Sequence, residues 1–161
     1  IGHTTVFLDG RDLPTARKGS LEAYVSAPGI KRTVFELLAK RIGPSELRSI
    51  SFDKLEASDI TEAAKRGDKI ALEAFDYTAR ILGLKLSDTI AHLSPEAIIL
   101  FGGLANAGDL LVAPTKKYME GYNLNIFRDK VKLLVSNLKG NNTAILGSSA
   151  LAWTELEKQK H

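Results

Sequence analysis

The sequence of 161 residues contains no cysteine, and it has only one methionine, one tryptophan and three histidines. The absence of cysteine excludes disulfide bonds and cysteine-ligated metal sites. The three histidines are scattered and lack the spacing of a tetrahedral zinc site. No apolar run approaches the roughly 20 residues that a membrane-spanning helix needs. We therefore expect a cytoplasmic protein with no zinc and no membrane partner.

Charge of one sign is not concentrated anywhere in the chain. The 22 basic and 19 acidic residues are interspersed, which leaves a net charge of +3 and no tract that is typical of nucleic-acid binding. The basic residues between Lys31 and Arg41 and at Lys116-Lys117 are better explained as solvated helix faces. The length and the 44% of hydrophobic residues predict one domain with its own core.

The chain begins with Ile1 rather than Met, and a strand-like run follows almost at once. We expect residues 1–161 to be part of a longer protein.

The first 41 residues predict one strand and two helices. Thr4–Leu8 is rich in β-forming residues and is closed by an Asp-Gly turn signal, and a loop follows over residues 11–19. Ser20 is suited to cap a short helix that runs to Pro28-Gly29. The second helix is expected from about Ile30 to Arg41.

The strongest periodicity lies after a short predicted helix at 58–66. Asp68 is suited to cap a helix of about 25 residues, whose apolar stripe is Leu72, Phe75, Ala79, Leu82, Leu86, Ile90 and Leu93, widened by Tyr77, Ile81 and Leu84. Gly83 lies inside this helix, where glycine costs roughly 1 kcal/mol relative to alanine. We expect another element to pack closely against it.

The last third of the sequence alternates between strands and helices. Ala97–Leu100 is a continuous apolar run that predicts a strand covered on both faces. A helix reaching about Glu120, a strand over Val131–Val135 and a final helix opened by Asn141-Asn142 should follow. This alternation predicts an α/β layered domain.

Gly102 and Gly103 follow the first of these strands directly. Two glycines permit close approach by a ligand, and the amino end of the next helix offers unpaired N–H groups to a polar or anionic group. The pattern is neither the dinucleotide fingerprint nor a P-loop. A tight strand-to-helix turn with no ligand explains it equally well.

His3 and Glu22 are the other candidates for binding. A histidine could donate a hydrogen bond to a hydroxyl group and a carboxylate could accept one or two, which is the mixture that sugars need. A solvated histidine and a glutamate that complements the helix dipole are the alternatives. His92 is explained by its place near the end of the long helix and His161 is terminal, so neither is selected.

Taken together, these motifs and their order along the chain resemble the C-terminal part of a protein of the ROK family, which contains repressors and sugar kinases. The matching segments are Ile1-Gly2-His3, Gly19-Ser20-Leu21-Glu22, the helix after Asp68, Gly102-Gly103 with Gly108, and Ala144–Ala152. The family's Glu-x-Gly-His motif would start one residue before Ile1. The resemblance implies that residues 1–161 form most of the C-terminal lobe of an actin/hexokinase-like ATPase, a ribonuclease H-like α/β fold.

The resemblance also implies roles for individual residues. His3 and Glu22 would contact sugar hydroxyls, and Gly102 and Gly103 would pass close to the adenosine of ATP. The family's phosphate motif and its catalytic Asp would precede residue 1. We therefore expect no catalytic residue in this chain and no turnover by this chain alone, with Mg²⁺ and ATP bound by the whole protein.

The chain departs from the family pattern at two places. The loop before Glu22 carries Leu13, Thr15 and Ser20 where the family has zinc-binding cysteines, it is about two residues shorter, and Ala16 replaces a glycine. Zinc cannot shape this loop. Phe101 replaces the first glycine of the adenosine motif, which narrows that turn.

Three functions fit the sequence. The first is an ATP-dependent hexose kinase resembling glucokinase, acting on a hexose or N-acetylhexosamine. The second is the sugar-effector domain of a repressor, in which an upstream helix-turn-helix would bind DNA; otherwise no nucleic-acid partner is expected. The third is an interaction domain with degenerate sites. A homodimer is compatible with each.

Overall fold

The computed structural model describes residues 1–13, 17–138 and 143–158. Thr15, Ala16, Asn141, Asn142 and His161 lie outside the described residues. Its elements are η1 (Leu21–Ala23), α1 (Ala27–Lys40), η2 (Glu46–Ser49), α2 (Ala57–Lys65), α3 (Lys69–Leu93), β1 (Ala97–Leu100), η3 (Gly103–Ala107), α4 (Asp109–Tyr122), η4 (Asn125–Phe127), β2 (Lys132–Val135) and α5 (Thr143–Lys158), where η marks a 3-10 helix.

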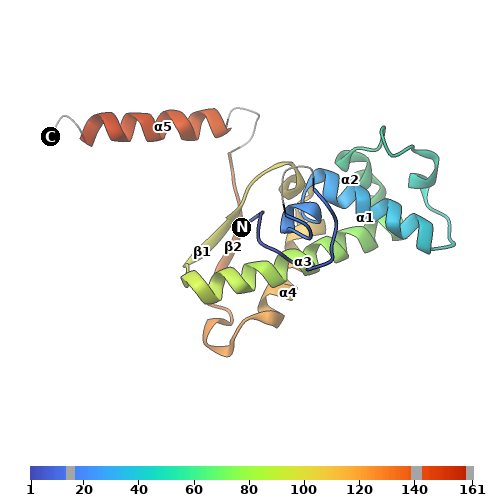
Figure 1. Ribbon diagram of the computed structural model, residues 1–161, viewed down its shortest axis with the longest axis horizontal. Helices are drawn as coiled ribbons and strands as arrows, with labels where there is room; N and C mark the ends of the chain where they lie inside the picture. The colour runs from blue at the N-terminus through green and yellow to red at the C-terminus, as the bar shows by residue number, and fades with distance from the viewer. Residues whose placement is uncertain (14–16, 139–142, 159–161) are drawn as a thin grey trace.

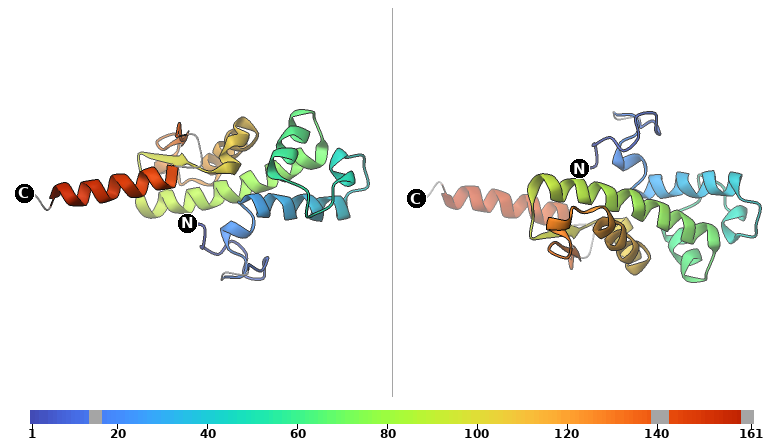
Figure 2. Two further views of the ribbon diagram at one scale, coloured as in Figure 1. Left: turned by 90° about the horizontal axis from the view of Figure 1, so that it is seen from above. Right: turned by 90° about the horizontal axis from the view of Figure 1, so that it is seen from below.

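Helix α3 is the central element of the fold (Figures 1 and 2). The carboxylate of Asp68 accepts hydrogen bonds from the amides of Ile70 and Ala71, at 2.9 and 3.0 Å, which confirms the predicted cap. Helices α1, α2 and α4 all pack against α3. The main core follows this helix, and its fully buried members include Phe75, Ala79, Leu86 and Ile90.

The ends of the predicted apolar stripe are not buried. Leu72 is 41% exposed and Leu93 is 71% exposed, and Leu84 also lies at the surface. Small residues that the predicted stripe did not include are buried instead: Ala71, Ala74 and Thr78 are fully buried. The buried face of α3 therefore includes these small residues and is not made of the predicted stripe alone.

The prediction for Gly83 is confirmed. A Cβ atom at this position would lie 2.8 Å from the amide nitrogen of Met119 and 2.9 Å from the carbonyl oxygen of Thr115. The backbone of α4 therefore crosses α3 at Gly83, and only a residue without a side chain fits there.

Strands β1 and β2 form a parallel pair in which Ile98 is opposite Leu133 and Leu100 is opposite Val135. Both strands lie where the sequence predicted them. The expectation that β1 is covered on both faces is wrong. Ile98, Leu100 and Leu133 pack against the core, whereas Ile99 and Leu134 are 63% and 45% exposed, because side chains alternate and the described helices cover one face only.

The strand predicted at Thr4–Leu8 is absent from the described structure. This segment makes a single antiparallel bridge, between Thr5 and Ser20. Turn hydrogen bonds from Thr4 to the carbonyl of Ile1 and from Gly10 to the carbonyl of Phe7 bend the chain on either side of the bridge. The β-forming side chains are present, but the backbone finds too short a partner to extend into a ladder.

The helix boundary predicted at Pro28-Gly29 is also wrong. The short helix is only the 3-10 turn η1, and α1 begins at Ala27 with Ser26 as its N-cap, whose hydroxyl accepts from the amide of Gly29 at 3.0 Å. Pro28 therefore lies in the first turn of α1, where its missing N–H group costs no hydrogen bond.

Helix α5 projects away from the rest of the fold (Figure 1). Ile145, Leu146, Leu151, Trp153 and Leu156 on this helix are each more than half exposed. Within the described residues, no helix combines the length and the apolarity needed to cross a bilayer.

Candidate functional site

The side chains of His3 and Glu22 lie next to each other although 19 residues separate them in the sequence. Their Nδ1 and Oε2 atoms are 3.7 Å apart, with 76% of the histidine side chain and 47% of the glutamate side chain exposed. Two backbone hydrogen bonds of 2.9 Å bring the segments together, from the amide of Glu22 to the carbonyl of Gly2 and from Leu21 to Thr4. A donor and an acceptor are thus presented together at an open surface.

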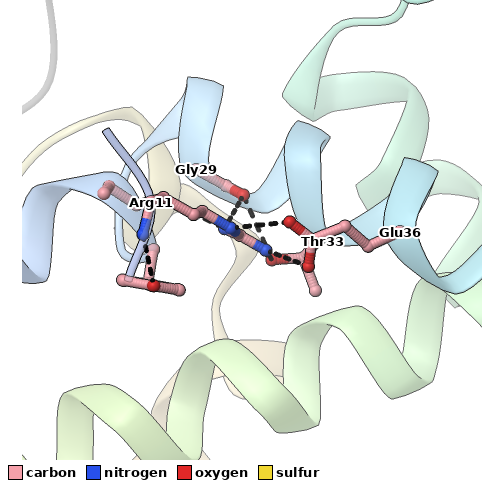
Figure 3. A network of polar contacts seen from close by, with 6 residues as sticks. Arg11, Gly29, Thr33 and Glu36 are labelled. Atoms are coloured by element: carbon pink, nitrogen blue, oxygen red, sulfur yellow. Dashed lines mark hydrogen bonds and ion pairs between the residues drawn. The ribbon is translucent and has the colours of Figure 1, made fainter. Parts of the chain in front are cut away.

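Arg11 connects the loop before Glu22 to the helix after it (Figure 3). Its guanidinium donates to the carboxylate of Glu36 through Nε at 2.9 Å and through Nη2 at 2.8 Å. Nη1 donates to the carbonyl oxygens of Ala23 and Gly29, both at 3.0 Å, and Nη2 also donates to the hydroxyl of Thr33 at 2.9 Å. The sequence did not single out Arg11, because its partners lie 12 to 25 residues away.

Glu22 also borders a hollow of about 410 Å³ that extends to Phe101. Among the described side chains that line it, only Glu22 is polar; the others include Leu82, Leu86 and Ile98. An apolar lining does not match sugar hydroxyls. The polar groups of this region are therefore on the exposed side of His3 and Glu22 rather than inside the hollow.

Gly102 and Gly103 form an open turn at the carboxyl end of β1. Gly102 has a φ of 116°, a conformation that only glycine adopts without strain, and a Cβ atom on Gly103 would meet nothing within 4 Å. The helix that follows differs from the prediction. The 3-10 helix η3 comes first and α4 begins only at Asp109, so the amino end of a long helix does not directly follow the two glycines.

A hollow of about 270 Å³ lies beside Gly103. Polar residues of α2 line it, namely Ser58, Thr61, Glu62 and Lys65, together with Asn106 of η3. We did not predict these residues from the sequence. Their spacing of i, i+3, i+4 and i+7 places them on one face of a helix, which is the signal that could have found them.

The loop before Glu22 does not fit a zinc ion. Leu13 has no ligand atom and packs in a small apolar cluster, and the buried hydroxyl of Ser20 has no hydrogen-bond partner among the described residues. The positive guanidinium of Arg11 stands inside this region. In the described part of the chain, no group of three or more histidine, aspartate or glutamate side chains could hold a metal ion.

The fold is known from solved structures. A ROK family glucokinase from Streptomyces griseus, in complex with glucose and AMPPNP, matches this chain with a TM-score of 0.79 and 26% identity, over 93% of this chain and 49% of that one. This likeness gives the chain the actin/hexokinase-like fold, and its mixture of helices and strands is consistent with part of one lobe.

The sequence profile of the ROK family matches residues 1–155, and the chain belongs to that family. A glucokinase of Halalkalibacterium halodurans is 34% identical over 155 residues, which cover 94% of this chain and 46% of the relative. The DNA-binding transcriptional dual regulator NagC of Escherichia coli is 25% identical over 151 residues, covering 94% of this chain and 36% of the relative. The chain therefore spans less than half the length of both proteins.

Proposed function

We propose that the full-length protein is an ATP-dependent hexose kinase and that residues 1–161 form part of its C-terminal lobe. The observation that carries the proposal is the convergence of His3 and Glu22, whose side chains lie 3.7 Å apart at an exposed surface. The glucokinase from Streptomyces griseus, solved with glucose and an ATP analogue, supports both ligands. Use of ATP also favours a cytoplasmic location.

His3 and Glu22 would bind hydroxyl groups of a hexose or N-acetylhexosamine. An imidazole N–H group donates and a carboxylate accepts, so the pair can hold two neighbouring hydroxyls and orient the one that reacts. Phosphoryl transfer depends mainly on such positioning and on stabilisation of charge. Mg²⁺ and the groups that bind the ATP phosphates would come from outside this chain, and the chain alone should be inactive.

Adenosine of ATP would lie at the turn of Gly102 and Gly103. The hollow of about 270 Å³ beside Gly103 offers hydroxyl, amide and charged groups from α2 and η3, and these can bind the hydroxyls of ribose. Gly103 is exposed and has open space around it, so a ligand can approach its backbone.

The test is a coupled assay of ADP release by the full-length protein with hexoses and N-acetylhexosamines. Glu22→Gln and His3→Ala should each lower kcat/KM for the sugar about 10- to 100-fold, which is the usual effect of losing a hydrogen bond to a charged group. His92→Ala is the matched control, because His92 is an exposed histidine in the last turn of α3.

The ATP side is tested by Gly103→Ala. The space around Gly103 accepts a methyl group without disturbing the fold, but the methyl group would occupy the space through which ATP approaches the backbone. This variant should therefore raise the KM for ATP and leave the KM for the sugar unchanged. A full-length protein that phosphorylates no hexose and no N-acetylhexosamine would contradict the kinase proposal.

The alternative is a sugar-responsive repressor, because NagC, a DNA-binding transcriptional regulator, also matches this chain. In that case the full-length protein would consume no ATP, and a helix-turn-helix upstream of residue 1 would bind DNA. A sugar would then change the affinity for DNA, and Glu22→Gln would abolish that response.

A further inference from the structure

We propose that Arg11, instead of a bound metal ion, holds the loop before Glu22 in position and thereby positions Glu22. The loop contains no cysteine and does not fit zinc, yet it must place Glu22 beside His3. Arg11 joins three segments at this point, namely its own loop, the 3-10 turn that carries Glu22, and α1. The claim about Glu22 rests on the proposed function, whereas the claim about the crosslink does not.

The contacts of Arg11 are complete. The five hydrogen bonds to Glu36, Thr33 and the carbonyls of Ala23 and Gly29 use all five N–H groups of the guanidinium. The side chain is only 10% exposed. A buried cation with every donor satisfied stays in one position, because each alternative position leaves donors unpaired.

Aromatic contacts add to this arrangement. The guanidinium carbon of Arg11 lies 4.5 Å from the ring centre of Tyr24, and the hydroxyl oxygen of Tyr24 accepts from the backbone amide of Arg11 at 2.9 Å. Tyr24 is buried and its ring packs edge to face on Phe7, with ring centres 5.2 Å apart. The loop is thus attached to the fold through both the backbone and the side chain of Arg11.

The crosslink reaches Glu22 through its neighbour. Arg11 holds the carbonyl of Ala23, the next residue after Glu22, and its own carbonyl accepts from the amide of Gly19 at 2.8 Å. Arg11 therefore binds both ends of the segment 19–23: its guanidinium binds Ala23 and its backbone carbonyl binds Gly19. Lysine has three donors and no planar fork, so it cannot reproduce these bonds.

The test uses the full-length protein with Arg11→Met and Arg11→Lys. The matched control is Arg41→Met, because Arg41 makes the same forked contact with Glu73, at 2.7 and 3.3 Å, but on the surface and away from the loop. We expect Arg11→Met to raise the KM for the sugar at least tenfold with less than a twofold change in the KM for ATP, and Arg11→Lys to have a smaller effect in the same direction. Arg41→Met should change neither constant.

Amide hydrogen exchange tests the crosslink without any substrate. The amides of Leu21, Glu22 and Val25 should exchange at least tenfold faster in Arg11→Met and at the wild-type rate in Arg41→Met. Exchange at the wild-type rate in Arg11→Met would overturn the inference even if the protein is a kinase. Unaltered sugar KM values in a protein with accelerated exchange would overturn the link to Glu22.

Two further outcomes separate the inference from the proposed function. If the wild-type protein acts on no sugar, the proposed function fails, and the exchange rates alone decide whether Arg11 is the crosslink. If elemental analysis finds one zinc per chain, and its removal by a chelator accelerates exchange at Glu22, then a metal ion organises the loop and the inference is wrong. We expect no zinc and no effect of the chelator.

Discussion

Among single residues, Asp68 links the beginning of α3 to the segment before α2. Its carboxylate accepts from Ile70 and Ala71 in α3 and from the amide of Glu46 at 3.0 Å. Partial burial opposes ionisation, but the hydrogen bonds from Ala71, Ser45, Glu46 and Ile70 outweigh it, and the pKa of Asp68 is lowered. The ionised form is therefore the one that the folded state stabilises.

The stability of the protein should depend on pH through Asp68. A carboxylate with a lowered folded-state pKa contributes its full stability above its ordinary pKa of about 4, and loses that contribution as the pH falls through the lowered value. Asp68→Ala should cost about 0.5–2 kcal/mol of unfolding free energy near neutral pH, which is typical of a lost N-cap.

Urea unfolding of the wild type and Asp68→Ala over a range of pH measures this effect. The difference between the two proteins should shrink as the pH falls below about 4. Asp53→Ala, at an exposed position, serves as the control and should show little difference at any pH. A difference for Asp68→Ala that stays constant down to the acid range would contradict the explanation.

Among the packed elements, the contact between α3 and α4 depends on Gly83. A methyl group there would lie 2.7 Å from the Cβ atom of Tyr118 and under 3.0 Å from two backbone atoms of α4. The helices would have to move apart, since backbone atoms cannot rotate out of the way. The hydroxyl of Tyr118 donates its one hydrogen to the carboxylate of Asp76, whose two oxygens both lie 2.9 Å away, and this bond reinforces the same contact.

Gly83→Ala should destabilise the protein by about 1–3 kcal/mol, the usual cost of overpacking, despite the better helix propensity of alanine. Gly121→Ala is the matched control, because Gly121 lies in α4 and the methyl group of an alanine there would have nothing within 4 Å. That control should raise stability by up to about 1 kcal/mol. Equal stability gains for both variants in thermal or urea unfolding would contradict the close approach.

Taken as a whole, the 161-residue chain presents apolar surface that its described elements leave uncovered. Exposed apolar side chains occur on the outer face of the sheet, at Ile99 and Leu134, and along α5, at Leu146, Leu151 and Trp153. Large apolar patches of this kind favour association. Trp153 is the single tryptophan of the sequence, so its fluorescence reports on α5 alone.

We expect the isolated 161-residue chain to self-associate as its concentration rises. Sedimentation should show larger species, and quenching of Trp153 by acrylamide should weaken, because association covers α5. Leu151→Glu should reduce both effects, whereas Leu8→Glu, at a leucine that is 86% exposed on the N-terminal loop, should not. A chain that stays monomeric with constant quenching would contradict this prediction.

Local signals in the sequence were enough to predict most of the helices and strands. The cap at Asp68, the periodic core of α3, the apolar runs of β1 and β2 and the glycine at position 83 were all readable, because each depends on residues a few positions apart. Residue type and place in the sequence made His3, Glu22, Gly102 and Gly103 candidates, and the family resemblance gave each of them a role. The bridge near Thr5 and the start of α1 were misjudged, because strand formation needs a partner and Pro28 fits both the end and the beginning of a helix.

Which of these residues meet depends on the tertiary packing alone. The approach of His3 to Glu22, the five hydrogen bonds of Arg11 and the polar face of α2 beside Gly103 each join segments that are far apart in the sequence. Such contacts depend on how the helices pack around α3, and no local pattern encodes that packing. The exposed face of β1 has the same origin, since an apolar run shows that a strand can be buried, while the neighbouring elements decide on how many sides.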